Sequence, residues 1–252
     1  MELFKFSASP ALSDREINLF LTRRFAAART PWGRWWLTAL VACKQALWHW
    51  EISSAAIAKR AFDIVASLAA IILLSPLLLL IAFLVRRDGG PALFRQTRVG
   101  KYGREFSMIK FRSMCLDAEA RLQALLAQNT HAEGVTFKLK NDPRITPVGR
   151  WLRKLSFDEL PQFFNVLMGD MSLVGPRPPL PREVALYSAA DRRRLAVKPG
   201  ITCLWQISGR ADIDFSGQVR LDVSYIENQN FWKDVQILVL TGPAVISGKG
   251  AS

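Results

Sequence analysis

Two adjacent carboxylates, Asp158 and Glu159, are the residues of this chain most capable of doing chemistry. Neighbouring side chains on a helix point about 100° apart, so the two cannot act as a symmetric pair. They could divide the work, with one holding a cation while the other attacks a substrate. Near a helix N-terminus, Asp158 would stay ionised, and the same helix end binds phosphate. A structural interpretation is also open, because Ser156 and Glu159 have the spacing of a capping box.

Basic residues elsewhere could supply the positive charge that a phosphate-handling site needs. Arg177 lies between two prolines, which fix the backbone and reduce the entropy lost on binding. This setting suits bidentate recognition of a phosphate, although a solvated turn residue would have the same neighbours. Lys110 and Arg112 alternate along a predicted strand, where they could line the same site or face water. The same alternatives apply to Arg210.

Several other chemistries are excluded by the sequence. It contains no Walker A loop, GxGxxG, HExxH or GxSxG motif, and its two histidines offer no base for a Ser-His-Asp triad. Three widely spaced cysteines make a disulfide framework or a zinc site improbable. Catalysis should therefore rest on carboxylates, Arg, Lys and a hard metal ion. Asp212 and Asp214 form a DxD triplet, which nucleotide-sugar glycosyltransferases use for a metal, but a solvated loop is the simpler interpretation.

One strongly apolar segment must help to position these residues. Residues 64–85 are apolar except for two serines and Pro76, and as a helix they would be long enough to cross a bilayer. Pro76 removes a backbone donor, so the helix should bend there into two limbs of about half a bilayer each. Basic residues flank both ends of the run and favour the cytoplasmic side. The alternatives are a kinked span and a re-entrant hairpin with its break at Ser75 and Pro76.

The composition of the whole chain also indicates a membrane. Thirty-four Lys and Arg against 21 Asp and Glu give a net charge of +13, yet 50% of the residues are hydrophobic. Nucleic acid would explain the charge but not the apolar content, whereas a lipid bilayer accounts for both. Five of the eight tryptophans lie between residues 32 and 50 among basic residues. This pattern favours a helix lying in the membrane interface over an amphipathic helix packed on its own domain.

These observations predict an α+β fold that is mainly helical. We expect an interfacial Trp/Arg-rich extension at residues 1–58, a membrane helix at 59–88 and a cytosolic catalytic domain at 89–252. The catalytic domain should contain a β-hairpin from residues 92–99 and 105–114. A helix should run from about residue 158 to 168 and stop at Gly169, and an apolar, surface-lying helix should cover 234–247.

A series of motifs occurs in a fixed order from Lys59 onward. They are KRAFD at 59–63, the Ser75-Pro76 break, FRQ at 94–96 with RVG at 98–100, KFRSM at 110–114, DPRIT at 142–146, SFDELPQ at 156–162, GDMSLVGPRP at 169–178 and PGIT at 199–202. With these motifs the chain resembles the bacterial sugar transferase family, the monotopic polyprenyl-phosphate phosphoglycosyl transferases, in its compact form. Residues 1–58 lie outside the resemblance.

The resemblance implies an enzyme of the phosphoglycosyl transferase class (EC 2.7.8). Such enzymes move a sugar 1-phosphate from a UDP-sugar to undecaprenyl phosphate at the cytoplasmic face of the bacterial inner membrane and release UMP. Asp158 would be the nucleophile that forms a covalent phosphosugar intermediate, and Glu159, with Asp158 beside it, would contact Mg²⁺. Arg153, Arg177 and Arg210 would contact the phosphates or the nucleotide. The resemblance also implies the re-entrant, monotopic hairpin.

Two departures from the family pattern are visible. Phe157 replaces the usual leucine, and Cys203 stands where glycine often follows the Gly-Ile-Thr motif. The segment at 204–210 resembles that of members which initiate exopolysaccharides with glucose or galactose.

The expected partners are a UDP-sugar, undecaprenyl phosphate and membrane lipids, with no nucleic acid, and a homodimer is one option for the assembly. The pathway would be that of a polysaccharide or glycoconjugate, of which this reaction is the first membrane step. Two other functions stay open. One is a membrane-bound DxD glycosyltransferase that releases UDP through Asp212 and Asp214, and the other is a non-enzymatic basic membrane scaffold.

Overall fold

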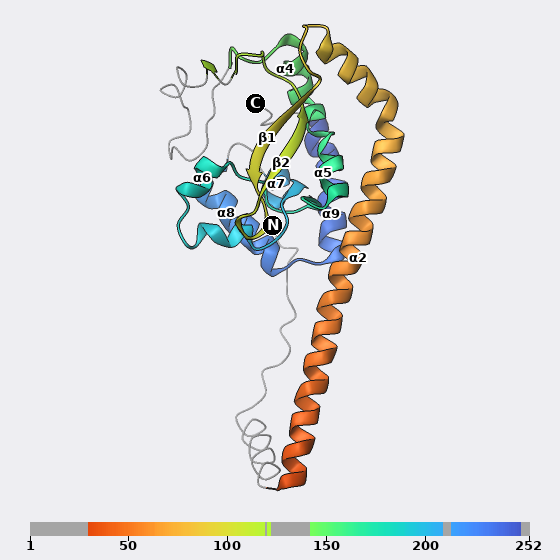
Figure 1. Ribbon diagram of the computed structural model, residues 1–252, viewed down its shortest axis with the longest axis vertical. Helices are drawn as coiled ribbons and strands as arrows, with labels where there is room; N and C mark the ends of the chain where they lie inside the picture. The colour runs from red at the N-terminus through yellow and green to blue at the C-terminus, as the bar shows by residue number, and fades with distance from the viewer. Residues whose placement is uncertain (1–29, 119, 122–141, 209–212, 248–252) are drawn as a thin grey trace. The chain divides into compact units, whose positions relative to one another are not determined.

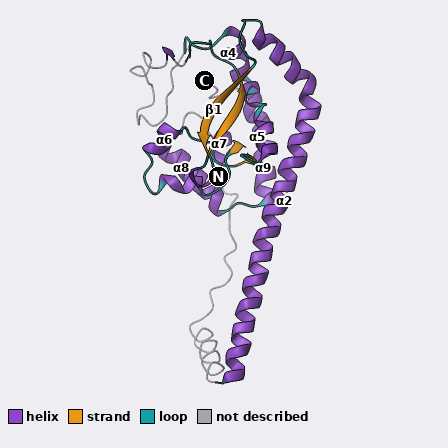
Figure 2. Ribbon diagram, in the orientation of Figure 1, coloured by secondary structure: helices purple, strands orange, loops and turns teal. Residues whose placement is uncertain are grey.

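The computed structural model describes residues 30–118, 120–121, 142–208 and 213–247 (Figure 1). The chain divides into two compact units, Met1–Ala56 and Ile57–Ser252. Helices dominate the described residues, and the strands form only two small sheets (Figure 2). This agrees with the mainly helical fold predicted from the sequence.

Helix α2 (Pro31–Arg86) contains the apolar segment, of which Ser54–Arg86 is long and apolar enough to cross a membrane. Only 11% of its most apolar window is buried inside the protein, unlike the core helix of a soluble domain. Pro76 lies inside the helix, which bends in its C-terminal part (Figure 1). The hydroxyl of Ser75 donates to the carbonyl of Ile72 at 2.8 Å, and this is the carbonyl that the missing N–H of Pro76 leaves unbonded. The bend is therefore stabilised locally, while the re-entrant arrangement stays a prediction.

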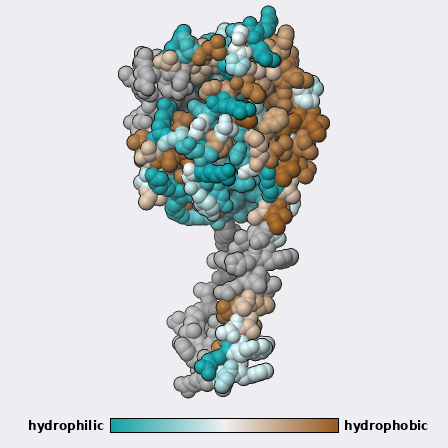
Figure 3. All heavy atoms as spheres, viewed as in Figure 1, coloured by the Kyte–Doolittle hydropathy of each residue, from teal (hydrophilic) through white to brown (hydrophobic). Residues whose placement is uncertain are grey.

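Within the larger unit, α2 packs on the core both before and after its bend. Before the bend, Phe62 and Ala66 pack against the main core, and after it, Ile81 and Val85 join a second buried cluster. The other face of the helix stays exposed, and Figure 3 shows apolar residues gathered on the side of the larger unit where α2 runs. Its exposed apolar side chains include Val65, Ile72, Leu73, Leu79 and Phe83. A continuous apolar face of this kind marks a surface for lipid or for a partner.

The smaller unit is described from residue 30 onward, and the side chains at 45–53 lie outside the description. Trp32 and Trp35 stack with ring centroids 5.4 Å apart, and both are exposed together with Trp36. The remaining tryptophans of the predicted interfacial helix, Trp48 and Trp50, belong to the part whose side chains are not described.

Strands β1 (Leu93–Val99) and β2 (Glu105–Phe111) form the predicted antiparallel hairpin, in which Leu93 pairs with Phe111 and Val99 with Glu105. The 3₁₀ turn η1 (Lys101–Gly103) joins them.

A second sheet was not predicted from the sequence. Strand β3 (Ser172–Val174) pairs in parallel with β4 (Gly200–Thr202). Beyond the strands, the N–H of Gly175 donates to Thr202 and the N–H of Gly200 donates to Pro176. A Cβ on Gly200 would lie 2.1 Å from the backbone nitrogen of Gly175, so this close pairing requires glycine. The sheet fixes the backbone on either side of the Pro176–Pro178 loop.

Short helices complete the larger unit. They are α4 (Pro147–Lys154), η3 (Phe157–Glu159), α5 (Gln162–Met168), α6 (Pro181–Ala185), η4 (Asp191–Leu195), α7 (Leu204–Ser208), α8 (Phe215–Glu227) and α9 (Phe231–Ser247). Helix α5 ends at Gly169 with a φ of 92°, as predicted, but it begins at Gln162 and not at Asp158. Proline is favoured at the start of a helix and disrupts its interior, and Pro161, at the N-cap of α5, leaves Asp158 in the separate turn η3.

The main core lies between α5, the two sheets, α8 and α9. Its buried residues are Met108, Val166, Met171, Leu173, Val174, Tyr225 and Ile237. The hairpin and α5 are further joined by Asn165, whose side chain accepts from the N–H of Ile109 at 2.9 Å and donates to Ser107 at 2.7 Å. These bonds hold the middle of β2 against the helix that follows Asp158.

Candidate active site

A cavity of about 1050 Å³ opens beside the hairpin, the η3 turn and the loop after β3. Six of the seven residues predicted to be catalytic or to bind phosphate line it, together with Arg98 and Arg194, which were not predicted. The six are Lys110, Arg112, Arg153, Asp158, Glu159 and Arg177. The seventh, Arg210, lies outside the described residues.

The turn that carries the carboxylates is built from the end of α4. Thr146 caps the start of α4, its hydroxyl accepting from Gly149 at 2.9 Å, and the helix ends in the basic residues Arg153 and Lys154. Ser156 follows with a φ of 55°, a left-handed conformation that is strained for a residue other than glycine. This reversal of the chain places Asp158 and Glu159 at the cavity.

The capping box allowed by the sequence is not formed. The side chain of Ser156 makes no capping hydrogen bond to the turn, and Glu159 accepts instead from Lys110, whose Nζ lies 2.7 Å from Oε1. Both carboxylates line the cavity, Glu159 pairs with Lys110 of the hairpin, and the capping-box interpretation is wrong.

The two carboxylates differ in their electrostatic surroundings. Burial raises the pKa of Asp158, the charge of Lys110 lowers it and Glu159 raises it again, and the net pKa lies above its usual value. Burial also raises the pKa of Glu159, but Lys110, Arg177 and Arg98 outweigh it, so this pKa lies below its usual value. Neighbouring acids whose pKa values are pushed apart can take different roles in a reaction.

Arg177 is presented to the cavity by a rigid loop. Its side chain is exposed, whereas the prolines at 176, 178 and 179 are buried. The carbonyl of Pro178 accepts from Arg98 Nη1 at 2.9 Å, and that of Pro179 accepts from the N–H of Val99 at 2.9 Å. The loop is thus anchored on β1, which leaves the guanidinium of Arg177 as its exposed feature.

Arg98 is a charged residue of the cavity that the sequence reasoning missed. It is 7% exposed, and burial, followed by the charge of Arg177, lowers its pKa to about 10. The signal available in the sequence was its place in the motif at 98–100, which gave no indication of contact with a loop 80 residues later.

Arg112 occupies a different position from the other cations. It is 7% exposed and forms an ion pair with Asp88, and it also donates to the carbonyls of Val85 and Pro91 at 2.9 and 2.8 Å. Of the two alternatives left open for Arg112, lining the site or facing water, the second is wrong. Its contacts hold the end of α2 against β2, and its role as a phosphate ligand stays a prediction.

The DxD triplet is only partly described. Asp214 caps α8, its carboxylate accepting from the N–H of Gly217 at 2.9 Å and from the hydroxyl of Ser216 at 2.7 Å. Asp214 is not among the described residues that line the cavity, and Asp212 lies outside the description. The capping role of Asp214 therefore accounts for an aspartate at this position without a metal.

The donor set at the carboxylates fits Mg²⁺ only in part. Over the described residues, no three Asp, Glu, His or Cys side chains come together as a metal site. Mg²⁺ is commonly held by one or two carboxylates together with substrate phosphates and water. Asp158 and Glu159 could therefore supply the protein side of a site that a bound diphosphate completes.

These features define a class of protein. The larger unit joins an apolar helix of membrane-crossing length to a cation-lined cavity with two unlike carboxylates, a combination suited to a membrane-associated enzyme that handles phosphate esters. Comparison with known proteins narrows this class. The model of the family described as "Bacterial sugar transferase" matches residues 54–248, and the chain belongs to this family.

Three relatives illustrate the family. The chain is 50% identical over 196 residues to "Galactosyl transferase CpsE" of Streptococcus agalactiae, covering 77% of this chain and 43% of that protein. It is 48% identical over 196 residues to "Undecaprenyl-phosphate galactose phosphotransferase" of Salmonella typhimurium, covering 77% and 41%. It is 43% identical over 198 residues to "Exopolysaccharide production protein ExoY" of Rhizobium meliloti, covering 77% and 88%. The chain thus spans less than half the length of the first two.

Proposed function

We propose that the protein transfers a sugar 1-phosphate from a UDP-sugar to undecaprenyl phosphate and releases UMP. The observation that carries this proposal is the buried carboxylate of Asp158 in a cavity whose other charged residues are mostly cations. A diphosphate bound there would have its charge neutralised before a carboxylate approached it. The names of the relatives, which include a galactose phosphotransferase acting on undecaprenyl phosphate, support the same reaction.

In the first half of the reaction, Arg177 and Arg153 bind the diphosphate of the donor, with Arg98 behind the loop of Arg177. An oxygen of Asp158 attacks the β-phosphorus, and a P–O bond forms as the bond from that phosphorus to the bridging oxygen breaks. UMP leaves with the bridging oxygen and its electron pair. The product is a mixed anhydride between Asp158 and the sugar phosphate.

In the second half, a phosphate oxygen of undecaprenyl phosphate attacks the same phosphorus. The bond to Asp158 breaks, the carboxylate is regenerated and the sugar diphospholipid leaves. Because the intermediate is covalent, the dissolved donor and the lipid acceptor need not occupy the cavity together. Mg²⁺ bound by Glu159 and Asp158 would supply further neutralisation of the diphosphate charge.

The acceptor places the reaction at a membrane. The exposed apolar face of α2 would enter the cytoplasmic leaflet, and the bend at Pro76 would return the chain to the side from which it came. Such a monotopic hairpin would hold the cavity at the depth of the lipid phosphate.

The test incubates the full chain in liposomes with undecaprenyl phosphate, Mg²⁺ and either UDP-galactose or UDP-glucose, and identifies the nucleotide released. UMP is the expected product, and UDP would indicate a glycosyltransferase instead. Asp158→Asn should abolish UMP release while membrane association persists. The control variant Asp191→Asn changes an aspartate outside the cavity lining and should still release UMP. Substantial UMP release by Asp158→Asn would overturn the assignment of the nucleophile.

A further inference from the structure

Three charged residues of α2, just before its apolar segment, form hydrogen bonds to β3 and α5, the elements next to the active site. They are Lys59, Arg60 and Asp63. We infer that Lys59 and Asp63 are positioning residues for Arg177, and that they couple the membrane helix to binding of the donor. This inference rests on the proposed function, because it assumes that Arg177 contacts the phosphates of the UDP-sugar.

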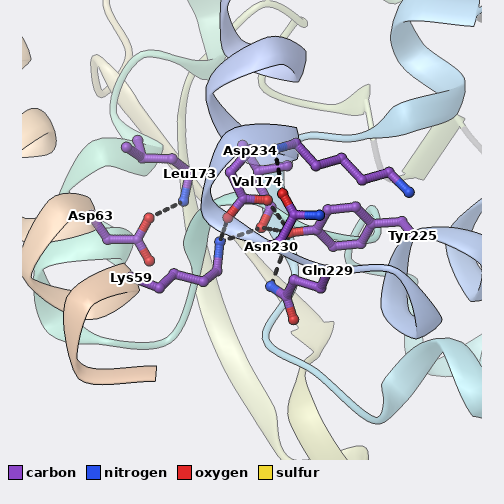
Figure 4. Close-up of polar contacts among 9 residues, drawn as sticks. Lys59, Asp63, Leu173, Val174, Tyr225, Gln229, Asn230 and Asp234 are labelled. Carbon is purple, nitrogen blue, oxygen red and sulfur yellow. Dashed lines mark hydrogen bonds and ion pairs between the residues drawn. The ribbon is translucent and has the colours of Figure 1, made fainter. Parts of the chain in front are cut away.

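Asp63 holds strand β3 directly. Its Oδ1 accepts from the backbone N–H of Leu173 at 3.1 Å, and its side chain is almost completely buried (Figure 4). Leu173 belongs to β3, four residues before Arg177. The carboxylate thus takes the place of a neighbouring strand for this N–H.

Lys59 reaches the next residue of the same strand. One turn earlier on α2 than Asp63, its ammonium donates to the carbonyl of Val174 at 3.3 Å and to Oδ2 of Asp234 at 2.5 Å. The hydroxyl of Tyr225 lies 2.7 Å from the other oxygen of Asp234 and 3.1 Å from the same carbonyl. Figure 4 shows these groups converging on Val174 from α2, α8 and α9.

The partners of Lys59 in this network are buried, which restricts its geometry. Asp234 and Tyr225 are each 2% exposed, and burial, together with the charge of Asp234, raises the pKa of Tyr225. Apolar side chains could attach α2 to the core at least as strongly, because desolvating charges is costly. An ion pair and directed hydrogen bonds add what apolar packing lacks, a fixed register of α2 along β3. This argues for a positioning role.

A short connection between β3 and Arg177 makes the position of Arg177 depend on that of β3. Only Gly175 and Pro176 separate Val174 from Arg177, and the N–H of Gly200 in β4 donates to the carbonyl of Pro176 at 2.9 Å. The segment that leads to Arg177 is therefore held by β4 at Pro176 and by α2 at Leu173 and Val174. A shift of α2 would move the guanidinium of Arg177 relative to Asp158.

Arg60 connects α2 to α5, the helix that follows the two carboxylates. Its guanidinium donates to the carbonyls of Val166 at 2.6 Å and Leu167 at 2.9 Å, at the C-terminal end of α5. This is the helix whose N-terminal end follows the turn with Asp158 and Glu159. One stretch of α2 thus contacts both β3 and α5.

The experiment compares Lys59→Met and Asp63→Ala with the conservative variants Lys59→Arg and Asp63→Asn in liposomes. Asp63→Asn keeps a side-chain oxygen that can accept from Leu173, whereas Asp63→Ala does not. We expect Lys59→Met and Asp63→Ala to raise the KM for the UDP-sugar about tenfold, with a smaller change in kcat. The conservative variants should recover most of the affinity. Glu227→Gln, which breaks an exposed ion pair with Arg193, is the matched control and should leave KM unchanged.

A double-mutant cycle with Arg177→Ala separates positioning from general destabilisation. If Lys59 and Asp63 act through Arg177, their substitution should raise KM little further once Arg177 is absent. Full additivity with Arg177→Ala, or a KM within about twofold of wild type for both Lys59→Met and Asp63→Ala, would overturn the inference. If Lys59→Met does not fold, the Asp63→Ala and Asp63→Asn pair decides. Failure of the wild-type protein to release UMP would reject the proposed function, and the inference with it.

Discussion

The ammonium of Lys110 lies 2.7 Å from Oε1 of Glu159, and this ion pair ties β2 to the turn that carries both carboxylates. The same cation lowers the pKa of Asp158 against the effect of burial. It therefore acts on the two acids differently, as a direct partner of one and as a nearby charge for the other. The backbone just before Lys110 is itself fixed, because Asn165 bonds to β2 at Ser107 and Ile109.

Removing the positive charge of Lys110 should shift the acid limb of the pH–rate profile. A nucleophilic Asp158 must be ionised, so the rate falls as the pH drops through its pKa. Lys110→Met removes a charge that lowers this pKa, and the acid limb of kcat/KM should shift to higher pH. The measurement is a pH profile of UMP release, with Lys154→Met, an exposed lysine at the end of α4, as the control. An unchanged acid limb in Lys110→Met would contradict the electrostatic account.

Much of this arrangement could be predicted from the sequence because its signals are local. The glycine at 169 ended a helix, alternation marked the hairpin, and Pro76 marked the bend of α2. Lys110 and Arg177 were identified from their residue type and their neighbours in the chain. Their meeting in one cavity could only be expected, because it depends on contacts between distant segments.

What the sequence did not reveal depends on those distant contacts. Strands β3 and β4 have three residues each, too few for any periodicity, and they pair across more than 20 residues of intervening chain. Arg98 anchors the proline loop through a hydrogen bond to Pro178, 80 residues later in the chain. The start of α5 was misplaced because Pro161, in a motif that looked helical throughout, confines the carboxylates to their own turn.

The strained residue before the carboxylates offers a test of how the turn is built. Ser156 has a φ of 55°, which costs an L-residue about 1–2 kcal/mol, whereas glycine adopts it freely at an entropic cost of about 0.5–1 kcal/mol. Ser156→Gly should therefore raise the free energy of unfolding by about 0.5–1 kcal/mol. Ser156→Val should lower it, because a branched Cβ is disfavoured in this conformation. Chemical denaturation in detergent measures both, and equal stability of the two variants would argue against a left-handed Ser156.

Substitution of Arg112 should lower the stability of the protein, whereas substitution of Arg177 should raise the KM for the UDP-sugar. Arg112→Met leaves Asp88 unpaired and the carbonyl of Val85 without its donor, so we expect a loss of about 1–3 kcal/mol in unfolding free energy, moderated by the exposure of Asp88. Arg177→Met removes an exposed guanidinium and should raise the KM for the UDP-sugar with little effect on stability. Denaturation curves and steady-state kinetics on both variants give the comparison. A stable Arg112→Met with a raised KM would instead make Arg112 a phosphate ligand.

The bend in α2 predicts the topology of the membrane segment. Because Pro76 cannot bond to the carbonyl of Ile72, and Ser75 satisfies that carbonyl instead, the helix bends at the point where the predicted hairpin would reverse. Reporter tags at residues 1 and 252 should both be cytoplasmic in the wild-type protein. Pro76→Ala restores the backbone donor and should straighten the helix, so that a fraction of the N-terminal tags becomes periplasmic. Pro243→Ala in α9 is the control and should leave both tags cytoplasmic, whereas a periplasmic tag at residue 1 of the wild type would mean that α2 spans the membrane.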